Sequence, residues 1–135
     1  MSFTQGGIYL TKLNPAKGKE VGKLRPSIIL TDQLILDTNP DVVFVCPLSS
    51  ASTTEYHFAH APITKRGLIN SDSFALIEHM RSISVDRLHR TLLGQVTLEE
   101  FTDILIKLNV QISPAHAFGH NCSTIHEPTT VYGTE

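Results

Sequence analysis

The sequence predicts an α+β fold in which short β-strands form a small curled sheet or barrel and a C-terminal helix packs on it. Three observations predict this fold. Apolar, β-branched runs alternate with turn residues between residues 8 and 83. After Thr97 the hydrophobic period changes from that of strands to that of a helix. The length of 135 residues fits a single hydrophobic core.

The predicted strands are rich in β-branched and aromatic residues, and Gly, Pro, Asn or Asp residues separate them. Pro26 fits only the start or the edge of a strand, because it has no N–H for the ladder. It also favours an extended backbone at Arg25. The predicted strands are residues 8–13, 26–31, 42–48, 56–61 and 74–83.

The helix is predicted from its first turn and from its apolar period. Thr97 and Glu100 have the spacing of a capping box, in which each side chain bonds the other residue's backbone N–H. The apolar face that follows consists of Phe101, Ile104, Leu105, Leu108 and Ile112. Pro114 ends the period, so we expect one domain over residues 1–112 and a weakly ordered tail over 113–135.

The composition is that of a globular domain that stays in the cytoplasm. Hydrophobic residues make up 41% of the chain and charged residues 18%. No apolar run approaches the roughly 20 residues that span a bilayer, and the N-terminus lacks the basic and apolar regions of a signal peptide. The two cysteines, Cys46 and Cys122, lie far apart, which argues against a disulfide framework.

Charge is distributed unevenly along the chain. The net charge is −2, yet residues 12–25 hold five basic residues and one acid, Glu20. Such a segment can bind phosphates although the whole molecule is acidic, or it can be a solvated loop.

The histidines do not predict a metal site. His57 and His60 are three residues apart in a predicted strand, so they would point to opposite faces. Other potential ligands lie in the tail without a packing pattern; these are His116, His120, Cys122 and His126. We therefore expect neither a metal nor a cofactor.

Several short motifs occur in one particular order along residues 6–111. They are Gly6-Gly7-Ile8-Tyr9, Asn14-Pro15, Gly18-Lys19-Glu20-Val21-Gly22, Arg25-Pro26, Pro47-Leu48-Ser49-Ser50, Gly67-Leu68, Asp72-Ser73, Glu78-His79-Met80-Arg81-Ser82-Ile83, Arg87-Leu88 and Gly94. In these motifs the chain resembles the MazF/PemK toxins. It departs from the family pattern at Gly7, where the family has Asp, at Ser49, where it has Thr, and at His79, where it has Gln.

The resemblance implies an SH3-like barrel of about five to seven strands with a C-terminal helix. It implies the toxin of a toxin–antitoxin system, a homodimer whose interface carries an RNA groove. The implied activity is sequence-selective, metal-independent cleavage of single-stranded mRNA by 2′-OH transesterification. The implied partner is a cognate antitoxin with an acidic C-terminal segment, and toxin and antitoxin together would bind DNA.

Within that resemblance, Arg25 and Ser49 suit the chemistry of phosphate. RNA supplies its own nucleophile, so the enzyme must align it, accept its proton and stabilise the phosphorane. Arg25 has fixed donors and a permanent charge for that last task. Ser49 would donate to a phosphate oxygen. The remaining RNA-binding residues that we expect are Lys17, Gly18, Lys19, Lys23 and Ser50.

Two carboxylates are candidates for the proton acceptor. Glu20 lies in the basic loop, where the nearby lysines favour its ionised form. Glu78 would share a strand face with Phe74, Leu76 and Met80 and would need a partner there, for which Arg25 is a candidate. The sequence does not choose between the two carboxylates.

Two other functions fit the same fold. A relative of the CcdB type would poison a topoisomerase by protein contact without catalysis, since fold does not fix function. An RNA- or peptide-binding module would bind without turnover. The basic loop that ends in Arg25-Pro26, together with Pro47-Leu48-Ser49-Ser50, favours the ribonuclease.

Overall fold

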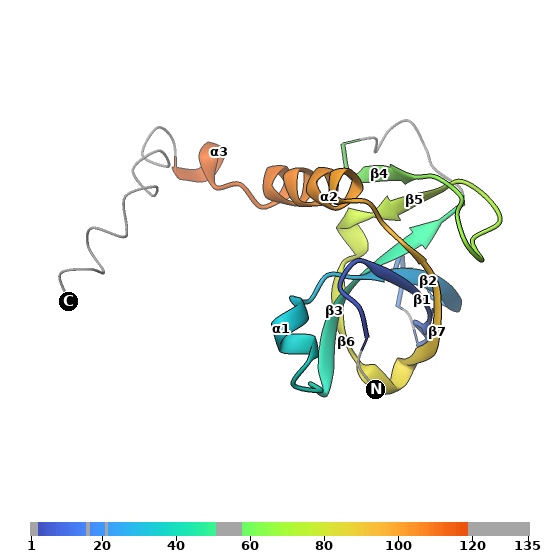
Figure 1. Cartoon of the computed structure of the whole chain (residues 1–135). Helices are drawn as coiled ribbons and strands as arrows, with labels where there is room; N and C mark the ends of the chain where they lie inside the picture. The colour runs from blue at the N-terminus through green and yellow to red at the C-terminus, as the bar shows by residue number, and fades with distance from the viewer. Residues whose placement is uncertain (1–2, 16, 21, 51–57, 119–135) are drawn as a thin grey trace.

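Seven strands form one curled antiparallel sheet, and a helix near the C-terminal end packs on it (Figure 1). The computed structural model describes residues 3–15, 17–20, 22–50 and 58–118. The strands are β1 (Gly7–Lys12), β2 (Leu24–Ile29), β3 (Val42–Ser49), β4 (His60–Ile63), β5 (Ser73–Leu76), β6 (Arg81–Ser84) and β7 (Leu88–Gln95). The helices are α1 (Gln33–Leu36), α2 (Leu98–Gln111) and α3 (Ala115–Phe118), with 3₁₀ turns η2 (Ile77–His79) and η3 (Val85–Arg87). The predicted α+β class, strand number and C-terminal helix are confirmed.

Strand β3 is the centre of the sheet. The order is β4-β5-β3-β2-β1-β7, and β6 also pairs with β3. One edge of β3 pairs with β2, while the other edge pairs first with β6 and then with β5. Within the described residues this path is open, so the sheet curls without closing into a barrel.

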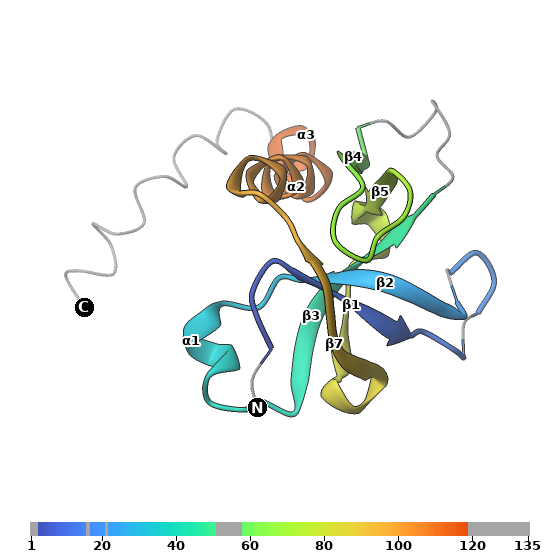
Figure 2. The same ribbon diagram turned by 45° about the vertical axis from the view of Figure 1, so that its right-hand side comes forward.

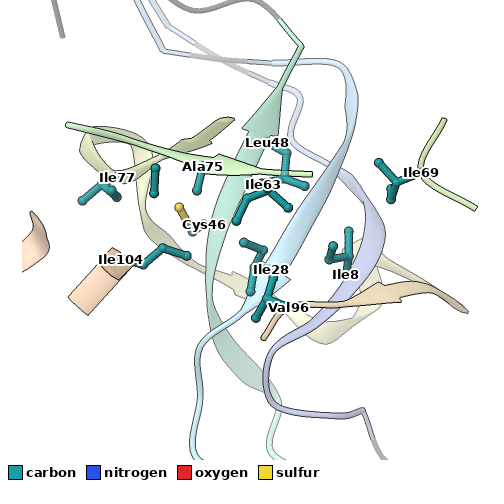
Figure 3. Packing of buried hydrophobic residues seen from close by; sticks show 11 residues of the cluster. Ile8, Ile28, Cys46, Leu48, Ile63, Ile69, Ala75, Ile77, Val96 and Ile104 are labelled. Carbon is teal, nitrogen blue, oxygen red and sulfur yellow. The ribbon is translucent and has the colours of Figure 1, made fainter. Parts of the chain in front are cut away.

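Two hydrophobic clusters lie on opposite faces of the central strands. Because successive side chains of a strand point to opposite faces, β2 places Ile28 in one cluster and Ile29 in the other. Figure 3 shows the first cluster, in which Ile104 of α2 points toward Cys46 and Ile28. The second cluster contains Tyr9, Leu36, Val43, Val45, Ile83 and Leu88 as well as Ile29.

Helix α2 begins with the predicted capping box. The Thr97 hydroxyl accepts from the Glu100 N–H at 3.1 Å, and the Glu100 carboxylate accepts from the Thr97 N–H at 2.9 Å. The predicted apolar face is only partly covered, since Ile104 is fully buried but Leu105 is 46% and Ile112 68% exposed. The sheet covers one narrow stripe of the helix and leaves the neighbouring apolar side chains in solvent.

The single strand predicted over residues 74–83 is wrong. This segment pairs with β3 in two places, as β5 and as β6, and η2 lies between them. Leu48 pairs with Ala75 and Val45 pairs with Arg81, so the segment advances six residues where β3 advances three. The 3₁₀ turn η2 accommodates the three additional residues, and a period-two pattern of apolar residues does not reveal such a turn.

Two predicted strand starts are corrected. Strand β2 begins at Leu24 rather than at Pro26, so Pro26 lies inside the strand. Strand β4 begins at His60 rather than at residue 56, and residues 56 and 57 lie outside the described part. The predicted tail begins with a one-turn helix, α3, and its residues 119–135 lie outside the described part. Among the described helices, none is long and apolar enough to cross a membrane.

An ion pair between Arg66 and Glu100 links the loop between β4 and β5 to the start of α2. Arg66 Nη1 and Nη2 donate to the two carboxylate oxygens of Glu100, and Nη1 also donates to the Gln95 carbonyl at 3.0 Å. Both side chains are mostly buried. Burial alone would raise the pKa of the Glu100 carboxyl, but the hydrogen bonds and the charge of Arg66 outweigh it and lower that pKa.

The Arg66–Glu100 pair predicts a pH dependence of stability. Because the pKa of Glu100 is lower in the folded state, its contribution is present above the ordinary value of 4.5 and is lost as the pH falls through the folded-state pKa. Urea unfolding from neutral pH to below 4.5 should therefore show a falling free energy of unfolding. In Glu100→Gln, which keeps the capping box, this fall should be shallower. An equally steep fall in Glu100→Gln would show that other carboxyls cause it.

Candidate functional site

A cavity that several of the predicted residues line lies where β1, β2 and β3 meet the loop between β4 and β5. It measures about 500 Å³. Its polar lining consists of Lys23, Arg25, Ser49, Ser50, Asn70, Ser71 and Ser73. Its apolar lining consists of Leu10, Leu24, Pro26, Leu48, Leu68, Ile69 and Leu93. The structure thus brings four of the predicted site residues, Lys23, Arg25, Ser49 and Ser50, to one cavity.

The pairing of β2 with β3 brings Arg25 and Ser49 together. Ser27 pairs with Pro47, and the same antiparallel register continued by two residues places Arg25 opposite Ser49. Arg25 is half-buried, and its Nε donates to the Gly22 carbonyl at 3.2 Å, which turns the side chain back toward the loop between β1 and β2. A guanidinium and a hydroxyl that line one cavity can together bind a phosphate group.

The loop between β1 and β2 carries the exposed lysines Lys17, Lys19 and Lys23. Figure 2 shows this loop on the same side of the sheet as the C-terminal end of β3. Gly18 has a φ of +56° and no neighbour within 4 Å of the position of a Cβ, so the turn uses glycine for its backbone conformation rather than for space.

Hydrogen bonds hold the base of this loop. The Lys23 N–H donates to Asn14 Oδ1 at 2.8 Å, and the Leu13 N–H donates to the Lys23 carbonyl at 2.8 Å. From η3, Arg87 Nη1 donates to the carbonyls of Lys12 and Asn14 at 3.2 and 2.8 Å. The lysines therefore extend from an anchored base.

The two candidate carboxylates line a second, separate cavity. It measures about 250 Å³ and is lined by Glu20, Glu78, His79, Met80 and Arg81. Glu20 is exposed, and its Oε1 accepts from the Lys17 N–H at 2.8 Å within the loop. The structure thus places the two carboxylates together, and His79 beside them, but not in the cavity that Arg25 and Ser49 line.

The surroundings predicted for Glu78 are wrong. Glu78 lies in the 3₁₀ turn η2, not on a strand face with Phe74, Leu76 and Met80. The partner that the structure shows for it is His60, not Arg25: His60 Nε2 lies 3.0 Å from Glu78 Oε2. The shift of register across η2 is the physical reason, because it turns residue 78 away from the face that alternation predicts.

His60 is the residue at this site that sequence reasoning missed. Its side chain is 8% exposed, whereas that of Glu78 is 32% exposed. The sequence separation of 18 residues between His60 and Glu78 gives no local signal of their contact.

Cys46 is a buried apolar residue, as expected. Burial, with a smaller effect from the negative charge of Glu78, raises the pKa of its thiol.

Within residues 3–118, apart from the undescribed positions, no group of three or more His, Cys, Asp and Glu side chains is placed to hold a metal ion. His60 and His116 are described, while His57, His120, Cys122 and His126 lie outside the described residues.

A comparison with protein families identifies the chain. A family model described as the PemK-like, MazF-like toxin of type II toxin–antitoxin systems matches residues 4–112. The chain belongs to this MazF-like family. No match was found among curated proteins.

Solved structures of MazF-like toxins share the fold. MazF from Deinococcus radiodurans aligns with a TM-score of 0.70 at 18% identity, over 83% of this chain and 97% of that one. The Mycobacterium tuberculosis toxin MazF-mt6 aligns with a TM-score of 0.63 at 18% identity, over 77% and 93%. An endoribonuclease from a mycobacterial species, solved in complex with its cognate antitoxin, aligns with a TM-score of 0.62 at 15% identity, over 81% and 93%. At these identities the likeness establishes the MazF fold.

Proposed function

We propose that this protein is the toxin of a toxin–antitoxin pair and a sequence-selective endoribonuclease that cleaves single-stranded mRNA in the cytoplasm without a metal. One observation carries the proposal. In a member of the MazF-like family, Arg25, Ser49 and Lys23 line one cavity beside an anchored, lysine-bearing loop. This combination offers a charged donor, a neutral donor and a backbone-binding segment to a phosphodiester.

The reaction needs no nucleophile from the protein. The 2′-oxygen of the RNA attacks the adjacent phosphorus, the P–O5′ bond breaks, and the product ends in a 2′,3′-cyclic phosphate. Arg25 stabilises the negative charge of the phosphorane, where a charge-assisted hydrogen bond is strongest. Ser49 donates to a non-bridging oxygen and orients the scissile group.

The proton of the 2′-OH passes to a carboxylate, and the departing 5′-oxygen takes a proton from water. Glu20 and Glu78 are the candidates, and both line the second cavity. An RNA strand that reaches from the first cavity to the second would bring its 2′-OH to one of them. The lysines Lys17, Lys19 and Lys23 would bind the phosphates of that strand, with Gly18 and Ser50 at its edges.

A second copy of the chain and an antitoxin are the proposed protein partners. Helix α2 leaves Leu105, Ile106 and Val110 46%, 59% and 60% exposed, a surface that a homodimer would cover. The mycobacterial relative was solved with its cognate antitoxin. We propose that the antitoxin of this chain lays an acidic C-terminal segment along the lysine loop, and that the complex binds DNA.

The first test is RNA cleavage by Arg25→Ala in the presence of a chelator. Wild type should cleave, and the variant should lose turnover by about 10²-fold or more, the scale of one oxyanion-type donor. Ser49→Ala should lose less, about 10-fold, because a neutral donor is weaker than a charged one. Arg90→Ala, which removes an exposed arginine of β7 outside both cavities, is the matched control.

Two results would contradict the proposal. Near-wild-type turnover by folded Arg25→Ala would exclude Arg25 from the site. RNA binding by wild type without any turnover, whether or not a divalent metal is added, would make the chain a binding module.

The second test concerns the lysine loop. Replacing Lys17, Lys19 and Lys23 with Gln should weaken binding to all RNA sequences alike and lower the log–log salt slope by up to about 2, since each phosphate contact on a single strand contributes about 0.7. The preference among cleavage sites should persist, because phosphate contacts position the strand and base contacts specify it. The corresponding triple Arg variant keeps the charge and should keep the slope. An unchanged slope in the Gln variant would place the RNA elsewhere.

A further inference from the structure

We infer that His60 is a positioning residue that holds Glu78 as the carboxylate that accepts the 2′-OH proton. This inference rests on the proposed function. It starts from the contact between His60 Nε2 and Glu78 Oε2, which are 3.0 Å apart. It assigns the proton acceptor to one of the two carboxylates and adds a second residue behind it.

His60 is itself held from two sides. In the sheet it pairs with Leu76, the last residue before η2. From α2, Lys107 Nζ donates to the His60 carbonyl at 3.1 Å and to Asp103 Oδ2 at 3.0 Å. With a side chain that is 8% exposed, the imidazole is too enclosed to touch RNA directly, and Glu78 is the more exposed group that it contacts.

Glu78 is both accessible to a ligand and fixed in its orientation, as a proton acceptor should be, whereas Glu20 is not held in this way. Its side chain is 32% exposed and lines the second cavity, so a ligand can reach it. His60 contacts Oε2, which leaves Oε1 as the oxygen at which a proton from RNA would arrive. A carboxylate fixed in one orientation before RNA binds avoids part of the entropic cost of reaching the transition state. Glu20 is exposed, and its bond to the Lys17 N–H closes a turn of its own loop.

Water is the one other reactant in the proton path, and the hydroxide that it leaves takes the proton back from Glu78. The O2′–H bond breaks and its proton moves to Oε1 of Glu78, the O2′–P bond forms, the P–O5′ bond breaks, and water protonates O5′. In the tautomer that carries its proton on Nε2, His60 donates to Oε2 and holds the carboxylate in one orientation.

Other charged or titratable groups also face this pair. They are Lys107 and Asp103 on α2, Cys46 on β3, Arg81 on β6, His79 on η2 and Glu20 on the loop. A variant that changes only residue 60 leaves all of them in place, so a difference between its kcat and that of wild type reports His60.

The experiment measures kcat and KM for RNA cleavage by His60→Leu, Glu78→Gln and the double variant. Since misplacing a catalytic group can cost as much as 10²-fold, His60→Leu should lower kcat by about 10-fold or more with KM nearly unchanged. In the Glu78→Gln background the same substitution should have almost no further effect. His60→Gln, whose amide can still donate to Oε2, should recover most of kcat. His116→Leu on α3 is the matched control and should behave as wild type.

The outcomes separate this inference from the proposed function. If Glu78→Gln lowers kcat but His60→Leu lowers it equally in both backgrounds, or not at all, the role of His60 is overturned and the ribonuclease stands. If Glu78→Gln cleaves as wild type does, Glu78 is not the acceptor and the inference fails, while Arg25→Ala still tests the ribonuclease. If His60→Leu does not fold, His60→Gln decides, since a kcat far below that of wild type in this variant, which keeps a donor to Oε2, overturns the inference.

Discussion

Strand β3 pairs with other strands along both of its edges, and the positions of the candidate residues follow from this pairing. Its pairing with β2 includes Ser27 and Pro47, and the same register continued by two residues sets Arg25 opposite the strand's last residue, Ser49. On the other edge, β3 pairs with β6 and then with β5, and the turn η2 that connects these two strands carries Glu78. A one-residue slip of β3 would exchange the two faces and separate the guanidinium from the hydroxyl. Burial of Val45, Cys46 and Leu48, at 0%, 0% and 1% exposed, opposes such a slip.

Around this strand, the loops that carry the candidate binding residues are fixed at their bases and left exposed at their tips. Arg87 holds the start of the lysine loop through two carbonyls. Arg66 holds the loop between β4 and β5 to α2, and that loop supplies Asn70 and Ser71 to the first cavity. Such an arrangement suits recognition, since a rigid scaffold positions the loops whose side chains contact the ligand. It also explains how a chain of net charge −2 can offer a basic surface: the lysines of residues 17–23 are concentrated on one anchored loop.

Local sequence signals predicted the parts of the structure that depend on local physics. The capping box of Thr97 and Glu100 gave the start of α2, and Pro26 gave the extended backbone at Arg25, although β2 begins two residues earlier, at Leu24. The meeting of Arg25 and Ser49 was predictable only through the family resemblance, because it depends on strand pairing across a connection of more than ten residues.

The part that failed depends on tertiary register. The alternation of apolar residues from Phe74 to Ile83 looks continuous in the sequence. The turn η2 interrupts it, because β5 and β6 pair with β3 in different registers. The contact of His60 with Glu78 is a consequence of that interruption. Likewise, the exposure of Leu105 and Ile112 reflects how little of α2 the sheet covers, which periodicity within the helix does not indicate.

The measurement that tests the central claim most directly uses an RNA oligonucleotide with a single 2′-deoxy nucleotide on the 5′ side of a bond that wild-type protein cleaves. Both this oligonucleotide and its all-ribose parent are incubated with the protein in the presence of a chelator. The account predicts that the parent is cut to a 2′,3′-cyclic phosphate and a 5′-hydroxyl, while the modified bond stays intact although the oligonucleotide still binds. Cleavage at the deoxy position, or a strict requirement for added metal ions, would contradict it.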